Sequence, residues 1–223
     1  MRKMHPSPPL GGRGQGEGGA LFMSPFLSAV LVAGSVLLLC PSRTQAHLVT
    51  TGLGPVYDGI SHLFMTFDDL IPVVALALLA GLNGPTAGRR ALFALPVAWL
   101  AGGVAGYQSG VVYLPAGITS LSFLALGILA AADRKFTPPV VTVLAATMGL
   151  MHGWLNGAGI AAAGRQASGL VGIAGAIFLL VSLVSAGVVS LRQPWTRIAV
   201  RVAGSWIAAI GLLLLGWSLK GRL

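Results

Sequence analysis

Long apolar segments dominate the chain, and short polar connections separate them. Each segment is long enough to cross a hydrocarbon core of about 30 Å as an α-helix. Because the connections are short, we expect sequential helices to be antiparallel neighbours. The pattern predicts an all-α, polytopic membrane bundle of about six transmembrane helices, with the expected ranges Asp58–Leu82, Arg90–Tyr107, Val111–Ala132, Pro138–Asn156, Ser168–Leu191 and Ile198–Leu219.

The N-terminal region has a different character. Residues 1–20 are a low-complexity Pro/Gly stretch, and residues 21–40 are an apolar run that is followed by PSRTQA. Thr44 and Ala46 fit the small-x-small pattern of a signal-peptide cleavage site. We therefore expect residues 1–46 to be a low-complexity tail plus a cleaved signal peptide, and residues 47–223 to be the six-helix transmembrane domain. An uncleaved first membrane helix is the alternative.

Composition supports an integral membrane protein. The 223 residues are 55% hydrophobic and 9% charged, whereas soluble domains carry about 25% charged residues. The net charge of +9 comes from basic residues that stand singly or in pairs, which is typical of orientation signals rather than of a nucleic-acid surface. The single cysteine, Cys40, excludes an internal disulfide and a CxxC motif.

Basic residues also predict the orientation. With the mature N-terminus outside, most of the Lys and Arg residues in the connections fall on the cytoplasmic side, namely Arg89, Arg90, Arg134, Lys135, Arg192 and Arg197. Only Arg165, Lys220 and Arg222 then fall outside. We expect a multi-pass protein of the bacterial inner membrane with an external mature N-terminus.

The first expected helix, Asp58–Leu82, carries an unusual polar stripe. Asp58, His62, Met65 and Asp69 fall within about 60° of one another at 100° per residue, and Asp68 lies roughly 80° to one side. Ionisable side chains are costly inside a bilayer and usually face other helices or a watery cavity. We therefore expect this stripe to face the interior of the bundle.

A second polar pair lies on the fourth expected helix at a similar depth. His152 and Asn156 are four residues apart and point the same way. Gly149, Gly153 and Gly157 repeat beside them and favour a close approach of another helix, which we expect to be the first. Imidazole and carboxylate groups are ligands for divalent transition metals. We predict a metal or proton site whose candidate metal ligands are His62, Asp68, His152, Asp69, Asp58 and Asn156, with Asp68 as the main carboxylate. The alternative is that each histidine only hydrogen-bonds a neighbouring helix.

Two stretches resemble a known family. GISHLFMTFDD (residues 59–69) is similar to the first-helix motif G-x-x-H-P-x-x-G-x-D-H of the HupE/UreJ family, and HGWLNG (residues 152–157) is similar to its later H-G-x-x-H-G motif. His62 and Asp68 match the first motif, and His152 matches the second. The resemblance implies a hydrogenase or urease accessory membrane protein, regarded as a nickel permease or metal-binding protein.

The chain departs from those motifs at several positions. Asp69 and Asn156 stand where the family has histidines, and Gly159 stands where an acidic residue is expected. Leu63 and Thr66 replace a proline and a glycine. The expected site is therefore richer in oxygen ligands, which weakens the specific expectation of nickel.

These observations favour an accessory protein that binds and imports a divalent, nickel-like metal ion for metalloenzyme maturation, rather than an enzyme. Its expected partners are the metal ion, the lipid bilayer and metalloenzyme maturation proteins, with no nucleic acid. Two alternatives stay open. One is an intramembrane hydrolase, either metal-dependent or built on Ser109 with His152 as its base. The other is a non-transporting structural or assembly partner of a membrane complex.

Overall fold

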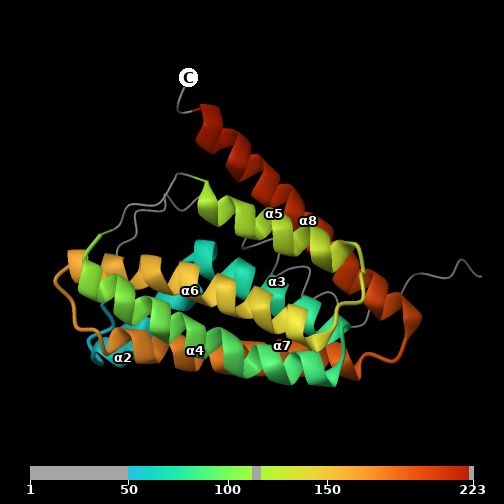
Figure 1. Ribbon diagram of the computed structural model, residues 1–223, viewed down its shortest axis with the longest axis horizontal. Coiled ribbons are helices and arrows are strands. Elements are labelled where there is room, and N and C mark those ends of the chain that lie inside the picture. Colours follow the sequence, from blue (N-terminus) through green and yellow to red (C-terminus); the bar gives the residue numbers. More distant parts are fainter. Residues whose placement is uncertain (1–49, 112–116, 221–223) are drawn as a thin grey trace, which may run out of the picture. The chain divides into compact units, whose positions relative to one another are not determined.

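The computed structural model describes residues 50–111 and 117–220 (Figure 1). The chain divides into two compact units, residues 1–43 and 44–223, and every described residue belongs to the second. The expected signal peptide, residues 1–46, lies outside the described residues. Within those residues the secondary structure is all-helical, with the seven helices α2 (Pro55–Met65), α3 (Phe67–Leu82), α4 (Pro85–Ser109), α5 (Ile118–Ala131), α6 (Pro138–Ala162), α7 (Gly169–Ser190) and α8 (Pro194–Lys220).

Proline marks the start of several helices. Pro55, Pro85, Pro138 and Pro194 each begin one. Proline suits the first helical turn because its missing N–H has no partner there and its fixed φ angle is already helical. Each helix from α4 to α8 falls on an apolar segment that the sequence predicted, with ends that differ by several residues.

The first predicted helix is two helices. We expected one helix over Asp58–Leu82, but α2 and α3 meet at Thr66 with a bend of 75°. Thr66 has an extended backbone (φ −103°, ψ 94°). Its N–H donates to the His62 carbonyl at the end of α2, and its own carbonyl accepts from Asp69 N–H at the start of α3. Asp68 and Asp69 lie in the first turn of α3, where the helix dipole favours negative charge.

The number of membrane spans follows from these lengths. Among the described residues, α4, α6, α7 and α8 are long and apolar enough to cross a membrane, and the bent α2–α3 pair brings the total to five if it forms one span. The described part of α5 is shorter, with 14 residues. The chain is thus a multi-helix membrane protein, and six spans stay a prediction.

Glycines hold α4 and α6 in close contact, and these two helices run side by side in Figure 1. A Cβ at Gly153 would overlap the carbonyl oxygen of Trp99, and one at Gly157 would overlap that of Gly103. The predicted close approach of the glycine face is therefore present, but its partner is α4. Our expectation that it packs against the first helix is wrong, because the Gly102 and Gly106 backbone on α4 offers the complementary small surface.

Helix α3 lies at the centre of the packing. It contacts α7, α5 and α4, and its residues from Val73 to Leu82 are almost all buried. Helix α5 packs mainly against α8, and the two run alongside each other in Figure 1. This arrangement buries Asp69, in the N-terminal turn of α3, among helices that carry polar side chains.

Candidate functional site

Asp69 is the hub of a buried polar cluster. Its side chain lies at the start of α3, and the residue is 5% exposed. Asp69 Oδ1 is 2.9 Å from His152 Nδ1, and Asp69 Oδ2 accepts a hydrogen bond of 2.9 Å from Asn156 Nδ2. His62 Nε2 approaches Oδ2 at 3.7 Å. We call His62, Asp69, His152 and Asn156 the Asp69 cluster; it joins α2, α3 and α6.

Both ring nitrogens of His152 are occupied. Nδ1 faces Asp69, and Nε2 is 3.1 Å from the hydroxyl of Ser122 on α5. The ring also stacks on Trp99 at a centroid distance of 5.5 Å and an interplanar angle of 25°, and the residue is fully buried. The imidazole is therefore fixed in position and orientation by three helices.

Asn156 has one satisfied end and one unsatisfied end. Its Nδ2 donates to Asp69 Oδ2 and to the His152 carbonyl, both at 2.9 Å. Its Oδ1 is buried and has no hydrogen-bond partner within the described part of the chain. The two acceptors beside Nδ2 fix this orientation, because the flipped amide would set oxygen against oxygen. A buried amide oxygen without a partner costs about 1–3 kcal/mol, and a cation or hydrogen-bond donor placed here would satisfy it.

A cavity connects this cluster to its surroundings. We call it the Asp69 cavity; its volume is about 280 Å³, and it is lined by His62, Thr66, Asp68, Asp69, Thr119, Leu155, Asn156, Gly159, Ile160 and Ala163. Asp68 is exposed and contributes its carboxylate to this wall. Four of the predicted residues therefore line one cavity, and His152 contacts the Asp69 carboxylate behind it. Asp69 rather than Asp68 lies at the centre of the polar contacts.

Asp58, the sixth predicted residue, lies in a different cavity. Its Oδ1 accepts hydrogen bonds from the N–H and hydroxyl of Thr51, at 2.6 and 2.7 Å. Its Oδ2 is 3.6 Å from Arg165 Nη1. We call this space, which is lined by Asp58, Arg165 and His62 among others, the Arg165 cavity. His62 borders both cavities.

The cluster as it stands is a hydrogen-bonded network. Among the described residues, no group of three or more His, Cys, Asp or Glu side chains is arranged to hold a metal ion. In this arrangement the His152 Nδ1–Asp69 Oδ1 contact occupies two atoms that could otherwise bind a metal. A cation at this position has to replace that hydrogen bond, with His62 and Asn156 Oδ1 as nearby donors of electron pairs.

Sequence reasoning missed three contributors to the site. Ser122 and Trp99 hold the His152 ring, and Thr66 forms the break between α2 and α3. Ser122 and Trp99 stand in apolar segments and carry no motif that points to the site. The acidic pair Asp68–Asp69, which follows Phe67 at the start of α3, was the available sequence signal for a new helix start.

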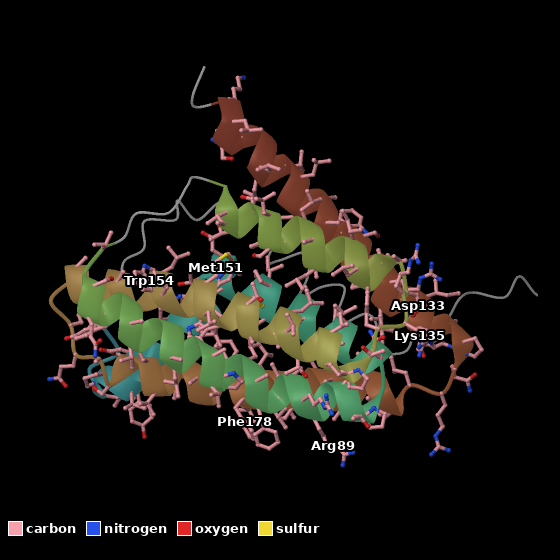
Figure 2. The ribbon with its side chains drawn as sticks, viewed as in Figure 1. Arg89, Asp133, Lys135, Met151, Trp154 and Phe178 are labelled. Carbon is pink, nitrogen blue, oxygen red and sulfur yellow. The ribbon has the colours of Figure 1, made fainter. Side chains whose placement is uncertain are left out.

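Two polar residues near the site, Trp154 on α6 and Ser109 on α4, make hydrogen bonds to backbone carbonyls outside the Asp69 cluster. Trp154, labelled in Figure 2, donates its Nε1 hydrogen to the carbonyl of Val111 at 3.2 Å. Ser109 donates its hydroxyl to the Gly106 carbonyl at 2.8 Å, within the last turn of α4. The described contacts of Ser109 and His152 do not join them, so the proposed serine–histidine pair has no support here.

The comparisons with known proteins agree with the two sequence motifs. The family model described as HupE / UreJ protein matches residues 35–214. A curated relative, Protein HupE from Rhizobium leguminosarum bv. viciae, is 27% identical over 183 residues, which cover 80% of this chain and 93% of the relative. No solved structure matches the chain. Because the family model covers most of the chain, the protein belongs to the HupE/UreJ family of membrane proteins.

Proposed function

We propose that the chain binds a divalent transition-metal ion at the Asp69 cluster and imports it for metalloenzyme maturation. The single observation that carries the proposal is the buried Asp69 carboxylate beside two imidazoles and the unpartnered Asn156 Oδ1. Imidazole nitrogen with carboxylate and amide oxygen forms a borderline ligand set that suits nickel-like divalent ions. Nickel is the first candidate because of the family resemblance.

The broken helix supports a role in transport. Discontinuous membrane helices commonly form the substrate and ion sites of transporters, because half-helix ends present backbone groups there. Thr66 breaks the α2–α3 pair within one turn of both His62 and Asp69. In this proposal the chain lies in the bacterial inner membrane with its Arg165 side outside, and the ion reaches the cluster from that side.

Charge balance favours a cation over a purely structural network. A carboxylate inside a membrane protein is costly unless it is paired. Within the described part of the chain, the partners of Asp69 are two imidazoles and one amide. A bound divalent ion would satisfy Asp69 and Asn156 Oδ1 together. Ser122 and Trp99 would keep the His152 ring in place during the exchange.

A non-transporting metal-holding protein is the second candidate. The observation that favours it is the composition of α3 beyond the site, because residues 71–82 contain no ionisable side chain and are mostly buried. A protein of this kind would deliver its ion to a maturation partner instead of across the membrane. Both candidates share the same metal site and differ in whether the ion appears on the other side.

Uptake into proteoliposomes tests the proposal. Purified protein is reconstituted, and vesicles are supplied with a panel of divalent ions outside and a metal-sensitive dye inside. We expect dye quenching with the intact chain and with Asp133→Asn, a matched change outside the Asp69 cluster, and none with Asp69→Asn. Binding without quenching in the intact chain would reject import and favour the metal-holding candidate.

A further inference from the structure

The Arg165 cavity is a second polar space beside the Asp69 cluster. It has a volume of about 300 Å³ and lies between α2, the start of α7 and the connection after α6; its lining includes Thr50, Asp58, His62, Ile160, Arg165 and Gln166. A water molecule occupies about 30 Å³ in the liquid. The cavity therefore has room for a cation together with its first hydration shell.

The two cavities share part of their walls. His62 and Ile160 line both the Arg165 cavity and the Asp69 cavity. On one side His62 lies one helical turn from Asp58, and on the other its Nε2 is 3.7 Å from Asp69. The imidazole is thus the polar group through which a ligand in the first cavity reaches the Asp69 cluster.

The Arg165 side chain contacts two residues that line the Arg165 cavity, Asp58 and Thr50. Its Nη1 lies 3.6 Å from Asp58 Oδ2, and its Nη2 donates to Thr50 Oγ1 at 2.7 Å. The carboxylate is anchored in turn by two hydrogen bonds from Thr51. The ion pair therefore places a positive charge directly on the acidic residue that would attract a cation.

The Arg165 backbone is fixed, although its side chain is about one third exposed. Gly164 ends α6 with a positive φ of 64°. Arg165 N–H donates to the Ile160 carbonyl at 3.0 Å, as in a glycine-terminated helix cap. The Arg165 carbonyl accepts from the Tyr107 hydroxyl at 3.0 Å. Because these contacts hold the backbone, a rotation of the Arg165 side chain can separate it from Asp58 without moving the helix end.

We propose that the Arg165 cavity is an entrance vestibule for a hydrated divalent cation, and that the Arg165–Asp58 ion pair is its gate. A divalent ion carries twice the charge of Arg165 and competes with it for Asp58. Once the guanidinium is displaced, the ion lies beside His62, which also borders the Asp69 cluster. This inference rests on the proposed function, because it assigns the route by which the cation arrives.

Thiol labelling at the inner cavity tests the gate without any metal. A Cβ at Gly159 meets no atom within 4 Å, and Gly159 lines the Asp69 cavity. Gly159→Cys is introduced with Cys40→Ala, and the protein in lipid nanodiscs is treated with a cationic methanethiosulfonate. Arg165→Gln, Arg165→Lys, Asp58→Asn and the distant Arg89→Gln are compared in this background.

The gate predicts changes of opposite sign. Arg165→Gln should raise the labelling rate about fivefold, the Boltzmann factor for two unit charges about 4 Å apart in water. Asp58→Asn should lower the rate by a similar factor, whereas Arg165→Lys and Arg89→Gln should leave it within about twofold of the parent rate. Size-exclusion profiles check that each variant is folded.

Equal rates in all variants would overturn the vestibule, because the reagent would then reach the Asp69 cavity by another route. A lower rate in Arg165→Gln would also overturn it. The proposed function is judged separately by metal binding in the intact chain. Absent binding with the expected labelling pattern would reject the metal site and leave the vestibule standing, and bound metal with equal rates would do the reverse.

Discussion

The two ends of α3 meet their surroundings in different ways. At the N-terminal end, Asp69 contacts two histidines and an amide, and one buried acceptor in that cluster has no partner among the described residues. At the C-terminal end, Lys135 Nζ donates to the Leu82 carbonyl at 3.0 Å, and Arg197 pairs with Asp133 at 2.9 Å. Figure 2 shows Asp133 and Lys135 together, away from Trp154 on α6.

Both ends obey the same electrostatics, with acidic groups at the helix N-terminus and basic groups at the C-terminus. The two ends differ in how completely their polar groups find hydrogen-bond partners. At the C-terminal end, Asn83 donates to the Leu79 carbonyl and accepts from Phe136 N–H, which completes the helix end with polar contacts. At the N-terminal end, Asn156 Oδ1 has no partner among the described residues, His152 contacts Asp69, and two cavities lie beside them. The comparison therefore separates a stabilising helix cap from a candidate binding site.

Replacing a carboxylate at each end should give the largest contrast. Asp69→Asn removes the charge of the cluster hub, and we expect metal affinity to fall by about a hundredfold or more, since loss of one partner of a buried pair costs about 3 kcal/mol. Asp133→Asn should leave affinity unchanged. Isothermal titration calorimetry measures both, and equal affinities of the two variants would contradict the role of Asp69.

Two glycines of α6 differ in their surroundings, because Gly153 packs against α4 and Gly159 faces open space. Gly153→Ala places a methyl group against the Trp99 carbonyl oxygen, so we expect a loss of about 1–3 kcal/mol in stability and a displaced His152. Gly159→Ala meets open space and should be neutral or stabilise α6 by up to about 1 kcal/mol. Thermal unfolding in detergent checks both variants. Equal unfolding temperatures of Gly153→Ala and Gly159→Ala would contradict the expectation that the close α4–α6 contact stabilises the helix that carries His152.

The smallest effect is expected at the C-terminal end of α3. Lys135→Ala removes the hydrogen bond to the Leu82 carbonyl, which we expect to cost about 1 kcal/mol of stability. Metal affinity should not change, because the change is made at the end of α3 opposite the Asp69 cluster. Parallel unfolding and calorimetry measurements test this separation. A large loss of affinity in Lys135→Ala would couple the two ends and reject the comparison.

Much of the architecture was readable from the sequence. Apolar segment length located the helices, because this signal is local. The starts of α4 and α8 at Pro85 and Pro194 lie several residues before the predicted starts at Arg90 and Ile198. The break at Thr66 was missed because the two aspartates that follow it were assigned to the polar stripe of one continuous helix. They lie instead in the first turn of a second helix, α3. The expected signal peptide and cleavage site stay predictions.

The sequence pointed to the residues of the candidate site but not to their arrangement around Asp69. His62, Asp69, His152 and Asn156 were singled out because polar groups are rare in apolar helices. Their hub was not predictable, since Asp68 and Asp69 are adjacent and only packing decides which is buried. The partner of the glycine face also depended on packing, because small residues favour close approach without naming the other helix.

Metal content is the measurement that tests the central claim most directly. The purified protein is exposed to divalent ions, and bound metal is quantified by mass spectrometry beside His62→Ala and His152→Ala. The account predicts about one equivalent of a specific ion in the intact chain and its loss in both variants. No bound metal in the intact chain, or metal that neither change affects, would contradict the site and leave the histidines as packing groups.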